Sequence, residues 1–469
     1  MFIKLNNIKN TIFHNKKNIF ILLFITIIGF FLRLYNNFEQ GYWPDEILTL
    51  IISNPLLPHE QTLKNWKELD GSPVLYFYFL KIFFLIFGFT AENGRLFSVI
   101  FSTLLIFLSY FFFRIRYNNY FSIIGALLIS LNIFLIWQAK ETRIPSTVIF
   151  FSTLNILYFY YVLNKITILK ILFLCFFNIF LVSYYPFTIT IVFSQLLFFL
   201  LIKKNKEKIK YIFFYFGSLI FYIFINYSYL IKWTGQGKGM IGPISYKFFF
   251  NFFFSSFFGS YFLGGTFLLI FFYTLYNIYK KRISINDIII FHLIIIFVTY
   301  AFLIIYTLFK SEIAIPRYFI FLIPSVLFVI LDLFRNSFSN KFFAKLIIFI
   351  VCINTIILLP KSSIPKPPMN VLINNLLKDD SNIVYFSDPG FDIFIKNYKK
   401  INNNYKIISL TDIDDHKKIW FFCFNNLRSV VGDLILPDEE KCNIKLANFR
   451  SVKTIYITDF KILLLERVN

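Results

Sequence analysis

Long apolar segments separated by short polar ones dominate the first 360 residues. A helix needs about 20 consecutive apolar residues to cross the hydrocarbon core of a bilayer. Eleven runs approach or reach this length, and we expect each to form one membrane-spanning helix. They cover about 18–35, 95–113, 120–137, 144–163, 168–185, 187–202, 211–231, 258–279, 287–309, 315–335 and 343–360.

A further apolar run, 73–89, carries Lys81 near its middle. A lysine at the bilayer centre costs about 2.5–3.5 kcal/mol on insertion scales. If this run does not cross, every strongly basic short loop falls on one side, which is the cytoplasmic side by the positive-inside rule. We therefore predict that 73–89 is a juxtamembrane helix on the outer face, with the N-terminus in the cytoplasm and the C-terminus outside. The basic groups that decide this are Lys4, Lys9, Lys16 and Lys17, Arg114 and Arg116, Lys165 and Lys170, the run 203–208, the run 280–282, and Lys341 with Lys345.

The pattern changes after Pro360, where residues 361–368 resemble a stiff proline-containing linker. Beyond it, short apolar runs typical of strands alternate with stretches typical of helices, which predicts a small soluble α/β domain. The expected strands are Asn382–Ser387, Ile419–Phe424, Lys453–Thr458 and Lys461–Glu466, and the expected helices are Met369–Lys378 and Phe391–Lys399. The expected fold is thus an all-α polytopic membrane domain over 1–360 and a small extracytoplasmic α/β domain over 361–469.

Composition supports the membrane class, since 58% of the 469 residues are hydrophobic and only 15% are charged. The net charge of +22 would suggest nucleic acid as the partner of a soluble protein, but here the basic residues report orientation, and we expect no nucleic-acid partner. The first apolar run has no small-residue cleavage site at its end, so we expect a signal anchor. The spacing of the histidine and cysteine residues does not support a metal site. A divalent metal nevertheless stays an open option. Cys423 and Cys442 either pair or stay free.

The motif Tyr42-Trp43-Pro44-Asp45-Glu46 places two adjacent carboxylates just beyond the first predicted span. On the outer face they would lie where a lipid-carried substrate meets a water-borne acceptor. A carboxylate there can take the proton of an acceptor hydroxyl, and we predict Asp45 as this base with Glu46 beside it. The alternative is that the pair belongs only to the solvated first turn of a short amphipathic helix.

Cationic side chains on the same face would hold the phosphate of a lipid-linked sugar, a leaving group that departs without a general acid. The pool is Arg95, Lys140, Arg143, Lys232, Lys238 and Arg317. The role of several residues stays open. Arg95 either contacts phosphate or anchors the start of its helix, and Arg317 either binds phosphate or snorkels to the interface. Glu141 and Arg143 either line a site or form an interfacial ion pair, and Lys232 and Lys238 either hold phosphate or are solvated loop charges. Four aromatic residues either stack on sugar rings or belong to the interfacial belt, namely Tyr42, Trp43, Tyr184 and Tyr185.

Several segments resemble, in order and spacing, the GT-C membrane glycosyltransferases, in particular the protein O-mannosyltransferases, lipid A aminoarabinose transferases and lipopolysaccharide-core transferases. The likeness covers roughly residues 18–330 and depends on the ordered set of segments, since no single motif is specific. Ser72, Lys140 and Ile47 depart from the family pattern, which usually has His or Lys, Gln, and Ala there. The segments are Arg33-Leu34-Tyr35, Gly41–Glu46, Ser72–Tyr78, Glu92–Ser98, Lys140-Glu141-Thr142-Arg143 and Pro316-Arg317-Tyr318.

The resemblance implies an inverting glycosyltransferase of the bacterial plasma membrane that moves a hexosyl or pentosyl group from a polyprenyl-phosphate carrier to a cell-envelope glycolipid or glycan. It implies Asp45 as base with Glu46 beside it, and a substrate site formed by Arg95, Lys140, Glu141, Arg143, Arg317 and Tyr318. A protein O-glycosyltransferase is the second enzymatic option, and a lipid-linked-sugar flippase or polysaccharide exporter is the option from another class. Neither the sugar, the acceptor nor the oligomeric state follows from the sequence.

Overall fold

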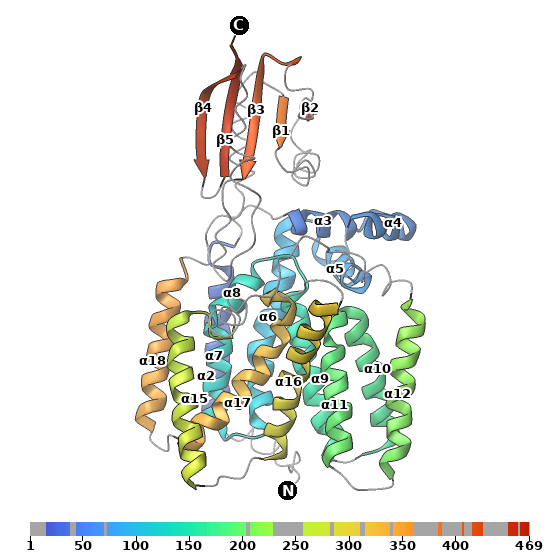
Figure 1. Cartoon of the computed structure of the whole chain (residues 1–469), viewed down its shortest axis with the longest axis vertical. Helices are drawn as coiled ribbons and strands as arrows, with labels where there is room; N and C mark the ends of the chain where they lie inside the picture. Colours follow the sequence, from blue (N-terminus) through green and yellow to red (C-terminus); the bar gives the residue numbers. More distant parts are fainter. Residues whose placement is uncertain are drawn as a thin grey trace.

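The computed structural model describes fourteen segments of the chain, and helices fill those before residue 361 while the strands lie beyond it (Figure 1). The described residues are 16–37, 44–69, 73–164, 166–202, 207–227, 257–281, 286–309, 315–337, 341–360, 383–386, 406–407, 415–424, 449–457 and 460–468.

Each of the eleven apolar runs predicted to span contains at least one helix. Within the described residues, five helices are long and apolar enough to cross a membrane by length and composition, or six if the bent pair α7 and α8 forms one span. The chain is a multi-pass membrane protein, and the count of eleven spans stays a prediction. The elements are α2 (Lys16–Leu34), α6 (Ala91–Arg114), α7 (Asn119–Leu131), α8 (Ile133–Ala139), α9 (Pro145–Asn164), α10 (Ile168–Tyr184), η1 (Pro186–Thr188), α11 (Ile189–Ile202), α12 (Glu207–Ile225), α15 (Tyr261–Lys281), α16 (Asp287–Phe309), η3 (Pro316–Leu322), α17 (Ile323–Ser337) and α18 (Lys341–Leu358).

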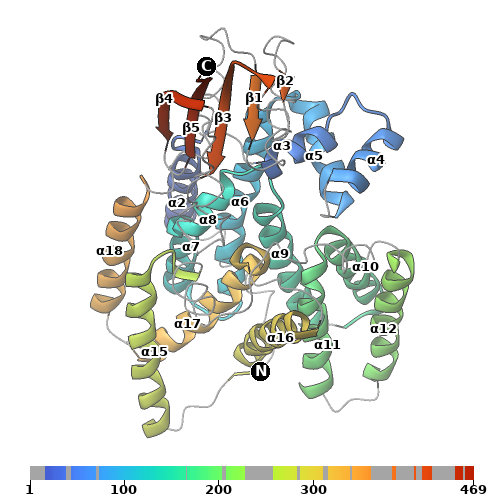
Figure 2. The same cartoon turned by 45° about the horizontal axis from the view of Figure 1, so that its top comes forward.

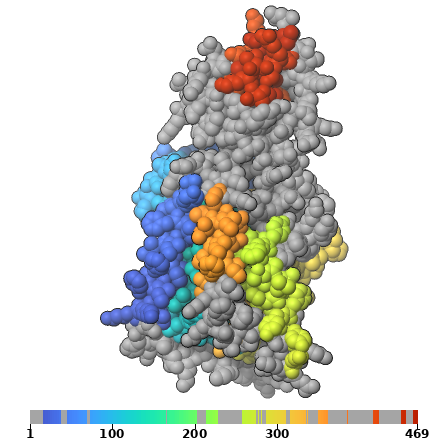
Figure 3. Space-filling view, turned by 90° about the vertical axis from the view of Figure 1, so that its left-hand side faces the viewer, coloured from blue at the N-terminus to red at the C-terminus, as the bar shows by residue number. Residues whose placement is uncertain are grey.

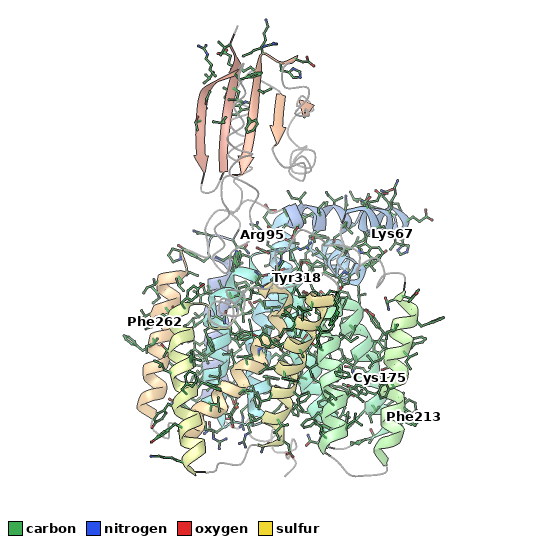
Figure 4. The ribbon with its side chains drawn as sticks, in the orientation of Figure 1. Lys67, Arg95, Cys175, Phe213, Phe262 and Tyr318 are labelled. Carbon is green, nitrogen blue, oxygen red and sulfur yellow. The ribbon has the colours of Figure 1, made fainter. Side chains whose placement is uncertain are left out.

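Large apolar side chains cover the outside of the bundle. Figure 3 shows one such face, on which α2, α18 and α15 lie next to one another. Phe24 is 56% exposed on α2, Ile356 is 72% exposed on α18 and Phe262 is 66% exposed on α15. Figure 4 shows Phe262, and Phe213 on α12, at opposite flanks of the bundle. In a bilayer this surface faces acyl chains, which explains the phenylalanine-rich stripes of the sequence.

Three shorter helices lie at one end of the bundle: α3 (Pro44–Ile52), α4 (His59–Leu69) and α5 (Val74–Phe87) (Figures 1 and 2). The run 73–89 forms α5, which the sequence predicted as a juxtamembrane helix. Lys81 Nζ donates to the Leu57 carbonyl oxygen at 2.5 Å and to Thr62 Oγ1 at 3.0 Å. The lysine in the middle of this apolar run is therefore satisfied by the segment around the start of α4.

The predicted span 120–137 is broken at Asn132, and α7 and α8 meet at an angle of 54°. Asn132 Oδ1 accepts the Leu135 N–H at 3.1 Å and so caps α8. Its Nδ2 donates to the Phe257 carbonyl oxygen at 2.8 Å, which ties the break to the segment before α15. Because α8 ends at Ala139, the bend sets the position of the segment 140–143 that follows it.

The C-terminal strands form one mixed sheet in the order β2-β1-β3-β5-β4. β1 pairs in parallel with β2 and β3, and β5 pairs antiparallel with β3 and β4. All four expected strands are present, and the two-residue β2 was not expected. The expected helices 369–378 and 391–399 lie outside the described residues, and the domain boundary after residue 360 stays a prediction. The strands are β1 (Ile383–Phe386), β2 (Lys406–Ile407), β3 (Lys418–Phe424), β4 (Phe449–Ile457) and β5 (Phe460–Arg467).

Candidate functional site

Asp45 and Glu46 occupy the first turn of α3 and point into different surroundings. Successive residues of an α-helix are rotated by about 100°, so neighbours in sequence do not share a face. The Asp45 side chain is 39% exposed, whereas Glu46 is completely buried. Of the two adjacent carboxylates, Asp45 therefore reaches the surface and Glu46 does not.

Two arginines from distant parts of the chain meet the same oxygen of Asp45. Arg317 Nη2 lies 3.3 Å from Asp45 Oδ2, and Arg143 Nη2 lies 3.6 Å from it. Arg143 follows α8 and Arg317 lies in the first turn of η3. The sequence placed these three residues on one face of the membrane, and the structure brings them together at the end of the bundle that carries α3.

The surroundings of Asp45 determine its ionisation. Partial burial raises the pKa of the Asp45 carboxyl, but the positive charges of Arg143 and Arg317 outweigh this effect. The pKa consequently lies below its usual value of 3.8, in spite of the neighbouring carboxylate of Glu46. Asp45 is therefore ionised at neutral pH and able to accept a proton, and its basicity is reduced by the two guanidinium groups.

Glu46 forms a buried two-pronged ion pair with Arg95 of α6. Arg95 Nε donates to Glu46 Oε1 at 3.0 Å, and Arg95 Nη2 donates to Glu46 Oε2 at 3.1 Å. The Thr142 N–H also donates to Glu46 Oε1, at 3.0 Å, and Arg95 Nη1 donates to the Asn37 carbonyl oxygen. Neither charged side chain is exposed. This geometry gives no support to the predicted substrate contact of Arg95 or to a chemical role for Glu46, because the pair instead joins α3, α6 and the segment 140–143.

The approach of α6 to that segment depends on Gly94. A Cβ atom at this position would lie 2.8 Å from Thr142 Cγ2 and 2.9 Å from Thr142 Oγ1, which is closer than real Cβ contacts allow. The absence of a side chain lets the Thr142 backbone come within reach of Glu46. Figure 4 shows the neighbouring Arg95 in the upper part of the bundle, below α3.

Within the segment 140–143, only Arg143 combines partial exposure with a contact to Asp45. Its Nη1 donates to Thr49 Oγ1 at 3.0 Å and to the Asp45 carbonyl oxygen at 3.2 Å, and its side chain is 16% exposed. Lys140 is fully buried, with Nζ 5.6 Å from the centre of the Tyr35 ring, and Glu141 is 4% exposed. Lys140 and Glu141 therefore lie next to the site but do not line an open surface.

The segment at the start of η3 contributes Arg317 and Tyr318. Arg317 is 35% exposed, and its guanidinium carbon lies 5.8 Å from the centre of the Tyr318 ring. The Tyr318 ring stacks on Phe187, with the ring centres 5.4 Å apart. In Figure 4, Tyr318 lies at the same end of the bundle as Arg95. An aromatic surface thus adjoins the charged group.

Other residues near the site include one that the sequence predicted to contact sugar and one that it did not predict. Tyr184, one of the aromatic residues considered for sugar stacking, is buried and donates to Thr147 Oγ1 at 2.7 Å, so it faces the core. Thr49 was missed, although its spacing of four from Asp45 on a helix indicates a shared face. The positions that lie outside the described residues are Tyr42, Trp43, Ser72, Lys232 and Lys238. Among the residues that the structure describes, no three His, Cys, Asp or Glu side chains come together as a metal site.

Comparison with known proteins adds a family and a fold. Residues 71–229 match the family model for dolichyl-phosphate-mannose-protein mannosyltransferase. No curated protein matches the sequence. Among solved structures, the chain is similar to ArnT from Cupriavidus metallidurans bound to undecaprenyl phosphate, with 10% sequence identity, a TM-score of 0.58, and coverage of 95% of this chain and 97% of ArnT. These matches confirm the resemblance found in the sequence: the chain is a membrane protein of GT-C fold, and its residues 71–229 match the mannosyltransferase family.

Proposed function

We propose that the protein is an inverting glycosyltransferase that moves a sugar from a polyprenyl-phosphate carrier to a glycolipid or glycan of the cell envelope. The observation that carries this proposal is an ionised, partly exposed Asp45 whose carboxylate contacts Arg143 and Arg317 at one end of a helical bundle. Both comparisons support a lipid-phosphate donor, since the family is named for dolichyl-phosphate-mannose and ArnT was solved with undecaprenyl phosphate.

The arrangement suits the chemistry of such a transfer. The acceptor oxygen attacks the anomeric carbon of the sugar, and the bond from that carbon to the phosphate oxygen breaks, with its electron pair leaving on the polyprenyl phosphate. The acceptor proton passes to the carboxylate of Asp45. Attack from the face opposite the leaving group inverts the anomeric centre. Arg143 and Arg317 supply positive charge at the site, which would stabilise the negative charge on the departing phosphate.

We place this site on the outer face of a bacterial plasma membrane, with the N-terminus in the cytoplasm and residues 361–469 as an outer domain. The end of the bundle opposite α3 is basic, which supports this orientation: α6 ends at Arg114, and Arg335 Nη1 donates to the Arg116 carbonyl oxygen. A flippase or exporter is less well supported, because the charged groups of the site gather at one end and not in mid-membrane.

Protein O-glycosylation is the second candidate, and the family match favours it, because the model that covers 71–229 describes mannosyl transfer to protein. The two candidates share the donor, the base and the bond that breaks, and they differ in the acceptor.

Mass spectrometry of the cell envelope tests the proposal. Cells that lack the protein are compared with cells complemented by the wild type, Asp45→Asn or Asp287→Asn. Asp287 is exposed in the first turn of α16, remote from Asp45, so the same chemical change there is a matched control. We expect the wild type and the control to restore a glycolipid or glycan heavier by one sugar, and Asp45→Asn not to restore it. A mass change confined to proteins would favour the second candidate, and restoration by Asp45→Asn would contradict both.

A further inference from the structure

The two arginines on Asp45 are held very differently. Arg143 contacts Thr49 Oγ1, the Asp45 carbonyl oxygen and the Asp45 carboxylate, and only 16% of its side chain is exposed. Arg317 is 35% exposed, and within the described part of the chain its guanidinium has one hydrogen-bonding partner, the Asp45 carboxylate. Among the described residues, one guanidinium is thus fixed to the scaffold, while the other contacts mainly the carboxylate of Asp45.

An arriving phosphate therefore competes with Asp45 for Arg317 more easily than for Arg143. A guanidinium binds a phosphate group through two parallel hydrogen bonds. The hydrogen bond from Arg317 Nη2 to Asp45 Oδ2, at 3.3 Å, is long for a charge-assisted contact. Arg143 would have to give up Thr49 and a backbone carbonyl to make the same exchange.

We propose that the donor phosphate draws Arg317 away from Asp45, so that the carboxylate becomes a stronger base only when the lipid-linked sugar is bound. This inference rests on the proposed function. It assigns Arg317 two successive partners, the carboxylate in the free protein and the phosphate in the complex. In the free protein the carboxylate is kept ionised and weakly basic, and the acceptor proton is taken only when a donor is present.

The charges around Asp45 determine the direction of the change. Glu46 in α3 is neutralised by Arg95 of α6, Glu141 precedes Arg143 in the segment 140–143, and Tyr318 follows Arg317 in η3. Burial is the largest influence on Asp45 and raises its pKa, while Arg143 and Arg317 together reverse that effect. With Arg317 bound to the phosphate, only Arg143 still lowers the pKa of Asp45, while burial and the negative charge of the phosphate raise it. The pKa of Asp45 therefore rises.

The pH dependence of transfer tests the proposal. The acid limb of kcat/KM reports the base in the free enzyme, and the acid limb of kcat reports it in the complex. We expect the kcat limb to lie at higher pH by about one unit, since an arginine partner lowers a carboxyl pKa by about 1–3 units. In Arg317→Gln the kcat/KM limb should move up to meet the kcat limb, and KM should rise. In Arg143→Gln both limbs should shift by the same amount and keep their separation, because in the wild type Arg143 contacts Asp45 both with and without the donor.

A second measurement needs neither turnover nor a variant of Arg317. Infrared difference spectroscopy follows the protonation of Asp45 in the wild type, with Asp45→Asn used to assign the band, in the absence and presence of undecaprenyl phosphate. The midpoint should lie at higher pH with the lipid phosphate. An unchanged midpoint, or coincident limbs in the wild type, would overturn the proposal while sugar transfer itself stands. A shifted midpoint in a protein that transfers no sugar would overturn the proposed function instead.

Discussion

Replacing Glu46 by glutamine should destabilise the protein severely, although the change is nearly isosteric. The carboxylate accepts two hydrogen bonds from Arg95 and one from the Thr142 N–H, at 3.0–3.1 Å. A glutamine offers one acceptor oxygen and directs an NH₂ group at a donor. It also removes the negative charge that faces the buried guanidinium of Arg95. Removal of one partner of a buried pair costs about 3–5 kcal/mol, and we expect a loss of that size in the free energy of unfolding.

The assay is unfolding of the purified protein in mixed micelles by titration with a denaturing detergent. Glu60→Gln supplies the control: Glu60 is exposed in the first turn of α4, and its replacement should change the free energy of unfolding by less than about 0.5 kcal/mol. A double variant, Glu46→Leu with Arg95→Met, removes both charges and should recover most of the loss. Recovery will be incomplete because the Thr142 N–H then lacks its acceptor, at a cost of about 1–3 kcal/mol.

Two results would refute this reasoning. A loss below about 1 kcal/mol in Glu46→Gln would mean that the ion pair is solvated or relaxes easily, as an exposed pair does. A double variant whose loss equals the sum of the two single losses would mean that the residues act independently. Either result would remove the distinction between a structural Glu46 and a chemical Asp45.

Other parts of the structure give further predictions. Gly94→Ala should destabilise the protein, because the new Cβ atom would lie 2.8 Å from a carbon of Thr142, and thermal unfolding should show a lower midpoint than for Gly265→Ala, whose Cβ meets nothing within 4 Å. Lys81→Met should release the start of α4, and hydrogen exchange in 57–62 should become faster while exchange in α6 is unchanged. Asn178→Leu breaks a ring of buried side-chain hydrogen bonds that joins α9, α10, α11 and α12, and should cost about 1–2 kcal/mol in detergent unfolding. A cysteine in place of the exposed Glu92 should react with an impermeant reagent added outside intact cells, and labelling only from the cytoplasm would contradict the proposed orientation.

The sequence predicted the fold best where the apolar or charged character of a segment alone decides whether it enters the bilayer. Apolar length located the helices, and Lys81 together with the distribution of basic loops led to the prediction that α5 is a juxtamembrane helix. The break at Asn132 was not predicted, although an asparagine within an apolar run is a typical helix N-cap. Strand β2 has two residues and no pattern of its own, because its place in the sheet depends on pairing with β1.

The site was predicted in part, and the reason is geometric. Charge and topology indicated that Asp45, Arg143 and Arg317 share one face, but not that Glu46 turns inward to Arg95. That pairing depends on the rotation of α3 about its own axis and on the close approach at Gly94, and neither follows from the order of residues. The same limit applies to Tyr184, whose burial depends on the packing of α5, α9 and α10 around it.

The role of Asp45 as the catalytic base can be tested by measuring sugar transfer by purified Asp45→Asn protein in liposomes that contain a polyprenyl-phosphate-linked sugar. We expect the rate to fall by about 10²–10⁴-fold, the usual contribution of a general base. We also expect undecaprenyl phosphate to bind at least as tightly as to the wild type, because Arg143 and Arg317 no longer neutralise a carboxylate. Transfer by Asp45→Asn at the wild-type rate would show that Asp45 is not the base.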